Sequence, residues 1–143
     1  MNKQINLSFF SDELKEVKTH KKEFLEQIER IMPWGELEEL VRPCYYEGKR
    51  GNKPYDLELM LRIHLLQNLY NLSDEGTRNE VIDSRAFSDF CGVESSNQIP
   101  DGDTIGRFRN LLINNHIHEQ FFALVVKTLA DRGLILKLSL IHL

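Results

Sequence analysis

The stretch PDGDTIGRFRNLL, residues 100–112, combines a helix start with side chains that hydrogen-bond to the bases of nucleic acids. We expect Asp103 to cap this helix. Its apolar residues then share one face: Ile105, Phe108 and Leu112. The opposite face carries Gly106, Arg107 and Asn110. Because arginine pairs with guanine and asparagine with adenine in the major groove, the pattern predicts a helix that contacts DNA.

Three neighbouring features bear on that prediction. Thr104 stands at the helix start, where a phosphate can bind, so we expect it to contact one. Arg109 falls at the edge of the apolar face, which favours a structural role with a packed stem. A short helix ending at Gly92 precedes, as in a helix-turn-helix unit, although the loop between the helices is longer than the usual tight turn.

A second candidate for DNA contact is the segment GKRGNKPY, in which Lys49, Arg50 and Lys53 are interleaved with glycines. A basic loop of this kind can lie against a phosphate backbone, since its cations release counterions from the DNA. A solvated linker fits the same residues equally well. Arg78 is a weaker candidate, because the helix around it is acidic.

Other kinds of chemistry find little support. His116 and His118 have no cysteine or histidine partner at zinc spacing, and the Asp101–Asp103 pair lacks the later ligands of a calcium loop. The pattern favours surface and cap residues there, and a hydrogen-bonded core histidine at His64. The sequence has no nucleophile elbow and no complete dinucleotide-binding loop. We therefore expect no metal and no cofactor.

At 143 residues, the chain has the length of one domain that can bury a core. Its 41% hydrophobic and 28% charged residues are typical of a soluble globular protein. The net charge of −4 counts against nucleic acid as a partner. Positive charges gather between Arg42 and Arg62, however, and negative ones between Ser73 and Glu94, and this segregation permits a basic face.

The location that we expect is the cytoplasm. The N-terminal residues lack the pattern of a signal peptide, and polar residues interrupt the most apolar run, Leu57 to Tyr70, so it cannot span a membrane. Cys44 and Cys91 are isolated from each other, which indicates buried thiols in a reducing compartment rather than a disulfide.

The hydrophobic spacing predicts a compact, mainly α-helical domain with a helix-turn-helix-like element and candidate short β-strands at its two ends. A first helix should run from an N-cap at Ser11 to Met32, followed by a short helix that Pro43 ends. The run Leu57 to Tyr70 is apolar on most sides, so we expect a buried central helix. The last helix should cover Ile117 to Arg132.

Several of these motifs also carry a family resemblance. The run PYDLELMLRIHLLQNLYNLSDEGTRNEVIDSRAFSDFCGV, followed by PDGDTIGRFRNLL, resembles the N-terminal domain of bacterial transposases of the insertion-sequence-5 group. The resemblance extends from about Leu7 to Leu136. It implies a helical DNA-binding leader that recognises the terminal inverted repeats of a transposable element. In that family, a ribonuclease-H-like domain follows, whose three acidic residues (the DDE set) hold two metal ions.

The chain departs from this family pattern after Lys137, where it reads LSLIHL and contains no aspartate after Asp131. The resemblance therefore implies a DNA-binding domain over residues 1–136 and a truncated or frameshifted tail over 137–143. It implies no enzymatic activity, because the catalytic acids are absent. The expected function is binding of terminal repeats in DNA transposition.

Two other interpretations stay open. The amphipathic segment Leu14 to Met32 could form a homodimer, or a mixed dimer that inhibits a full-length transposase. A non-functional pseudogene product is the third reading.

Overall fold

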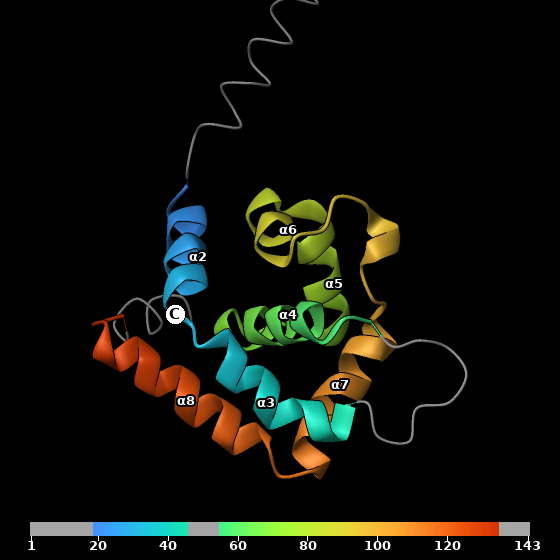
Figure 1. Ribbon diagram of the computed structural model, residues 1–143. Coiled ribbons are helices and arrows are strands. Elements are labelled where there is room, and N and C mark those ends of the chain that lie inside the picture. The colour runs from blue at the N-terminus through green and yellow to red at the C-terminus, as the bar shows by residue number, and fades with distance from the viewer. Residues whose placement is uncertain (1–18, 46–54, 135–143) are drawn as a thin grey trace, which may run out of the picture.

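The computed structural model describes residues 19–45 and 55–134 (Figure 1). Seven α-helices and one 3₁₀ turn account for most of them, and none of the described residues is in a β-strand. The elements are α2 (His20–Ile31), α3 (Trp34–Tyr45), α4 (Leu57–Leu69), α5 (Asp74–Asp83), α6 (Arg85–Cys91), η1 (Ser96–Gln98), α7 (Gly102–Asn114) and α8 (His118–Asp131). The prediction of a mainly α-helical domain is confirmed. The candidate strands at the two ends lie outside the described residues.

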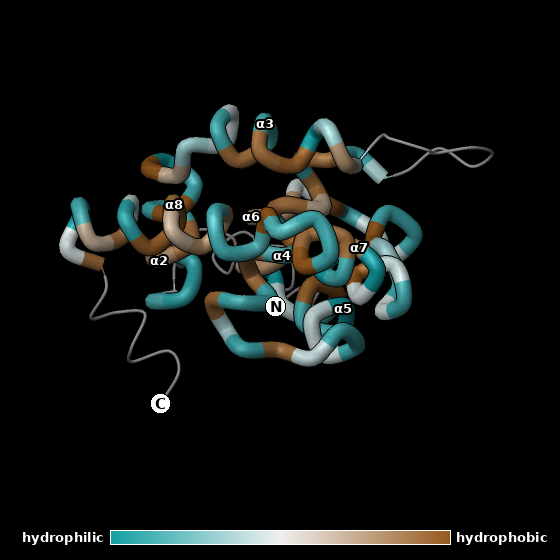
Figure 2. The backbone as a smooth tube through the Cα atoms, turned by 90° about the horizontal axis from the view of Figure 1, so that it is seen from below, coloured by the Kyte–Doolittle hydropathy of each residue, from teal (hydrophilic) through white to brown (hydrophobic). Residues whose placement is uncertain are grey.

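Helix α4 is the centre of the fold, as its apolar circumference predicts. Ten of its thirteen residues are buried. It packs against α3, α5, α6 and α7, and apolar segments gather around it in Figure 2. Because it is covered on several sides, a polar side chain on α4 has to find its partners inside the protein.

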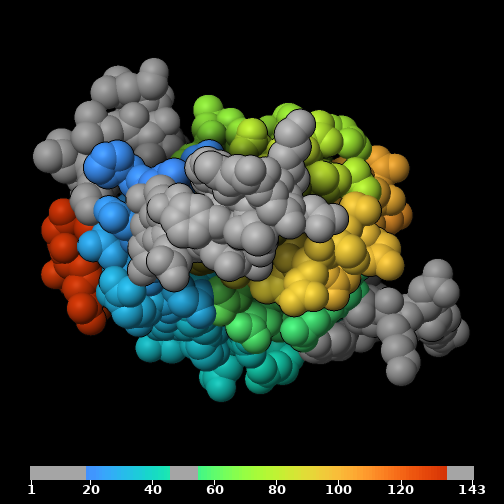
Figure 3. All heavy atoms as spheres, turned by 90° about the horizontal axis from the view of Figure 1, so that it is seen from above, coloured from blue at the N-terminus to red at the C-terminus, as the bar shows by residue number. Residues whose placement is uncertain are grey.

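The remaining helices pack on one another as well as on α4. Helix α2 lies against α6, helix α5 against α6 and α7, and helix α8 against α3 and α7. Seen from above, α2 and α8 (blue and red) lie on one side, and α5 to α7 (yellow-green to orange) on the other (Figure 3). None of the helices in the two described ranges is long and apolar enough to cross a membrane.

The described part of the proposed dimerisation stripe faces the core of its own domain. Phe24, Ile28 and Met32 are all buried. Lys21, which interrupts the stripe, stays at the rim: its Nζ lies 4.9 Å from the centroid of the Phe87 ring, and 41% of its side chain is exposed. These apolar residues of α2 therefore belong to the core of the domain, while Leu14 and Val17 of the same stripe lie outside the described residues.

The start of α2 differs from the sequence prediction. Thr19 has an extended backbone, and its hydroxyl accepts a hydrogen bond from the Lys22 N–H at 3.2 Å. The helix therefore begins at His20 and does not run unbroken from Ser11, which itself lies outside the described residues. A threonine in this position competes with helix continuation because its side chain satisfies an N–H of the first turn.

The end of α3 also differs from the prediction, since Pro43 lies inside the helix, which continues to Tyr45. Proline removes the hydrogen bond to the carbonyl four residues earlier, that of Glu39. Glu39 is exposed, so water can satisfy that carbonyl and the last turn tolerates the proline. The left-handed glycines that end helices are confirmed at Gly92 (φ 70°) and Gly133 (φ 69°).

Candidate nucleic-acid interface

Helix α7 has one buried and one exposed side. The predicted apolar face is confirmed, since these residues are buried: Ile105, Phe108 and Leu112. Arg107 and Asn110 are exposed on the other side, and Thr104 is half-buried beside them. Asp103 and Asn114 extend the exposed side toward the two ends of the helix. The structure therefore brings together three of the sequence-predicted DNA-binding residues on one helix.

The cap of α7 is Asp101 rather than Asp103. The carboxylate of Asp101 accepts a hydrogen bond from the Thr104 N–H at 2.8 Å, and its own backbone is extended. Asp103 lies in the first turn and is exposed. Both aspartates suit a cap, but only Asp101 stands one residue before the first helical residue, Gly102, where its side chain reaches an unbonded N–H.

Gly106 is buried, so its predicted place on the exposed face is wrong. A Cβ atom at Gly106 would lie 2.7 Å from Oδ2 of Asp74, and one at Gly102 would lie 2.0 Å from Oε1 of Glu75. The two glycines are one turn apart and let α5 approach α7 closely. Their spacing of four residues indicates a close approach of another helix, but it does not identify α5 as that helix.

Asp74 joins three helices at the same contact. Its carboxylate forms an ion pair with Arg109 of α7 and accepts a hydrogen bond from Nε2 of Gln67 of α4 at 2.8 Å. The structural role predicted for Arg109 is therefore confirmed. The carboxylate of Asp74 therefore links α5 to both α4 and α7. Sequence reasoning missed Asp74.

The packing of α7 differs from the expected helix-turn-helix pair. Helix α6, which precedes it in sequence, packs on α2, α4 and α5, whereas the main partner of α7 is α5 (Figure 1). The connection between α6 and α7 contains η1, where Oε1 of Gln98 accepts hydrogen bonds from the N–H groups of Glu94 (2.6 Å) and Ser95 (3.1 Å). This connection has its own local structure and separates the two helices.

Arginine and carboxylate side chains lie together near the start of α7. The backbone N–H of Thr104 does most to hold the pKa of Asp101 below its usual range, its hydroxyl adds to this, and the charges of Arg107 and Arg78 lower it further. Both guanidinium groups therefore lie close enough to act on this carboxylate. Arg107 also donates a hydrogen bond to Oγ1 of Thr104 at 3.2 Å. Arg78 thus reaches the candidate interface from α5.

The basic residues Lys49, Arg50 and Lys53 lie outside the described residues, but the positions that flank them are defined. The Tyr45 hydroxyl donates a hydrogen bond to the Tyr55 carbonyl. The Tyr45 ring packs edge-on against Phe108 of α7, with 5.7 Å between centroids. Tyr45 and Tyr55, which flank this segment, are therefore in contact with each other, and Tyr45 is in contact with α7.

The family described as "Transposase domain (DUF772)" matches residues 12–111. The chain belongs to this transposase-domain family. The matched range contains every candidate DNA-binding residue. It also contains helices α2 to α6 and most of α7. No solved structure matches the chain.

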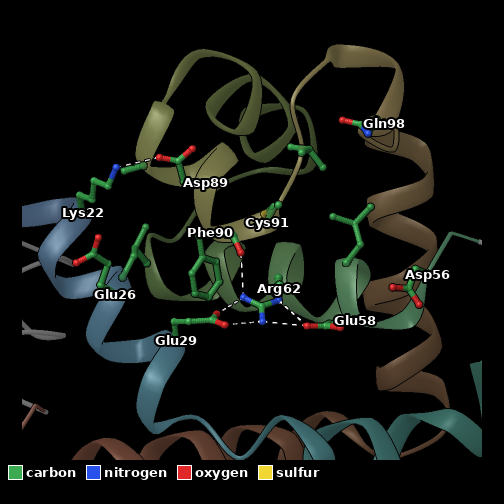
Figure 4. A pocket seen from close by; sticks show the side chains of 15 residues that line it. Lys22, Glu26, Glu29, Asp56, Glu58, Arg62, Asp89, Phe90, Cys91 and Gln98 are labelled. Atoms are coloured by element: carbon green, nitrogen blue, oxygen red, sulfur yellow. Dashed lines mark hydrogen bonds and ion pairs between the residues drawn. The ribbon is translucent and has the colours of Figure 1, made fainter. Parts of the chain in front are cut away.

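A second polar region of this transposase domain is a hollow of about 710 Å³ between α2, α4 and α6 (Figure 4). Arg62 on α4 forms ion pairs with Glu29 and Glu58 there and donates to the Phe90 carbonyl at 2.9 Å. Burial lowers the pKa of Arg62, but the two carboxylates raise it by more. Within the described ranges, no three His, Cys, Asp or Glu side chains are grouped to hold a metal ion.

The transposase domain also buries a histidine, as the sequence predicts for His64. Its ring is 1% exposed, and its Nδ1 has no hydrogen-bond partner among the described residues. Burial does most to lower the pKa of His64, and the neighbouring charges of His118 and Arg109 add to this, which brings the pKa to about 3. His118 is half-buried, with its ring centroid 5.9 Å from that of His64, so the prediction of a surface residue at His118 is wrong.

Proposed function

We propose that this transposase domain binds DNA through the exposed side of α7, with the terminal inverted repeats of a transposable element as its target. The observation that carries the proposal is the placement of Arg107 and Asn110 on an ordered helix with their side chains in solvent. Asn110 makes no side-chain hydrogen bond to any residue of the described ranges. Its amide and most of the Arg107 donors are available to a ligand.

The inner side of α7 supports the proposal, because recognition of bases requires a helix that does not rotate. Burial of the apolar face, the glycine contact with α5 and the Asp74–Arg109 ion pair all act on that inner side. A helix with its side chains is about 10–12 Å across, which fits a major groove about 12 Å wide.

Contacts to the DNA backbone would come from residues around this helix. The Arg78 guanidinium and the Thr104 hydroxyl lie near its start, where Asp101 already caps the helix. Lys49, Arg50 and Lys53 come between Tyr45, which packs against Phe108 of α7, and Tyr55, which is hydrogen-bonded to Tyr45. We propose that these cations bind phosphates, so that affinity falls steeply as salt increases. The proposed activity is binding alone, with no catalytic role for any described residue.

The test is duplex selection followed by affinity measurement. Duplexes enriched from a random library are bound by wild type and by Arg107→Ala, with fluorescence anisotropy as the readout. We expect Arg107→Ala to reduce the preference for the selected over a scrambled duplex by roughly 1–3 kcal/mol, which is about fivefold to 150-fold. Arg85→Ala, at an exposed arginine on α6, is the control and should retain the preference.

The basic segment gives an independent arm of this test. Replacing Lys49, Arg50 and Lys53 by alanine should weaken binding of selected and scrambled duplexes alike and flatten the salt dependence. Equal affinity of wild type and Arg107→Ala for both duplexes, in folded protein, would contradict the assignment of α7.

A further inference from the structure

The exposed residues of α7 form an ordered stripe. Asp103, Arg107, Asn110 and Asn114 follow one another at intervals of four, three and four residues, and all are exposed. This spacing places them along one side of the helix. The stripe contains no lysine, and its one arginine and one aspartate cancel in charge. These side chains suit hydrogen bonds to base edges better than attraction to phosphates.

We propose that Arg107 reads a guanine, that Asn110 reads an adenine within about two base pairs of it, and that Asp103 is a further specificity-determining residue. This inference rests on the proposed function. The two reading residues are three positions apart, a rise of about 4.5 Å along the helix, against about 3.4 Å between base pairs. Neighbouring bases are therefore within their reach.

The place of Asp103 at the first turn gives it a distinct role. The N-terminal residues of a recognition helix contact base edges, and Asp103 is the first exposed residue of the stripe. A carboxylate accepts a hydrogen bond from cytosine N4 and repels phosphates. Asp103 therefore favours a cytosine and lowers affinity for unrelated DNA. Asn114, at the other end of α7, lies beyond the bases that the first turns reach.

The experiment replaces Arg107 or Asn110 by a residue with different hydrogen-bonding groups and determines whether the protein then selects a different base. Wild type and variants of the full chain select from a library of random duplexes, and the enriched sequences are read. Asn110→Asp should replace the selected adenine by cytosine, because a carboxylate only accepts hydrogen bonds. Arg107→Gln should replace the guanine by adenine. A structural role at either position would weaken binding without exchanging one base for another.

Asp103→Ala should lose preference for one base pair and bind scrambled duplexes more tightly, by about tenfold at low salt. Asn114→Asp is the matched control on the same stripe and should leave the selected bases unchanged. Thermal melting by circular dichroism checks that each variant is folded.

The outcomes separate this inference from the function on which it rests. If wild type enriches a motif that neither Asn110→Asp nor Arg107→Gln alters, DNA binding stands and the reading assignment is overturned. If folded wild type enriches nothing, the proposed function fails and the inference fails with it.

Discussion

Arg62 and Arg107 show how one residue type takes two roles in the same small domain. The Arg62 side chain is 11% exposed, and its donors go to Glu29, Glu58 and the Phe90 carbonyl. Arg107 is exposed and donates to the hydroxyl of Thr104. An arginine whose donors are taken by its own chain stabilises that chain, whereas an exposed one can pair with a ligand.

The helices that carry the two arginines explain the difference. Helix α4 is packed on several sides, so a charge there is costly unless carboxylates and carbonyls meet it. Helix α7 is packed on one side, and its other side is open. The hollow around Arg62 is therefore part of the scaffold, and the exposed side of α7 is the surface that we propose for DNA binding.

Replacing Arg62 by methionine should have the largest effect on stability. The change removes two ion pairs and the contact with the Trp34 ring, which lies 4.3 Å below the guanidinium. We expect the free energy of unfolding to fall by about 2–3 kcal/mol. This is below the usual loss for a buried pair, because both carboxylates are nearly half exposed and regain water. Urea unfolding monitored by circular dichroism measures it.

The matched control is Arg42→Met on α3. Arg42 pairs with Glu38 four residues earlier, but 52% of its side chain is exposed, so its loss should cost under about 1 kcal/mol. DNA affinity of Arg62→Met, measured where the protein is folded, should equal that of wild type. A large loss of DNA affinity in folded Arg62→Met would contradict the assignment of Arg62 to the scaffold alone.

The next largest effect on stability should come from His64, a buried polar ring whose Nδ1 has no hydrogen-bond partner among the described residues. It differs from both arginines, because this polar atom is neither exposed nor paired with any described residue. Its pKa in the folded state is about 3, against 6.5 for an exposed histidine, so below pH 6.5 only the unfolded chain takes up this proton. The contribution of the neutral His64 ring to stability is therefore fully present above pH 6.5 and is lost as the pH falls toward 3. Between pH 7 and pH 5 the loss from this group should be about 2 kcal/mol.

Unfolding of His64→Phe over the same pH range isolates this contribution. The variant keeps a ring among Phe108 and Phe121 but cannot bind the proton, so its stability should depend less on pH. His20→Ala, at the exposed first residue of α2, should retain the wild-type dependence. Parallel pH profiles for wild type and His64→Phe would show that the ring is protonated in the folded state.

Sequence reasoning succeeded where the pattern is local. The spacing of Ile105, Phe108 and Leu112 predicts both the helix and its buried side, because one period governs both. It failed where the partner lies far along the chain. Nothing near Gly106 reveals that Asp74 will face it, and nothing near His118 reveals His64. Such contacts depend on how helices are placed, which local propensity does not determine.

The contact between Gly106 and Asp74 joins the scaffold to the proposed binding surface, and Gly106→Ala tests it with the smallest of these effects. The added Cβ would stand 2.7 Å from Oδ2 of Asp74, a side chain whose other oxygen, Oδ1, is held by Arg109 and Gln67, so α7 or Asp74 must shift. We expect a net loss of about 1–2 kcal/mol despite the better helix propensity of alanine.

The same substitution at Gly35 on α3 is the control, because a Cβ there meets nothing within 4 Å and should leave stability equal or slightly higher. If α7 rotates in Gly106→Ala, the preference for selected over scrambled duplexes should fall, whereas the affinity for scrambled duplexes should change less. The reason is that phosphate contacts tolerate a tilt of the helix that base contacts do not. If Gly106→Ala proves as stable and as selective as Gly35→Ala, the close contact with α5 does not orient the helix. The exposed side of α7 would then owe its direction to the apolar face alone.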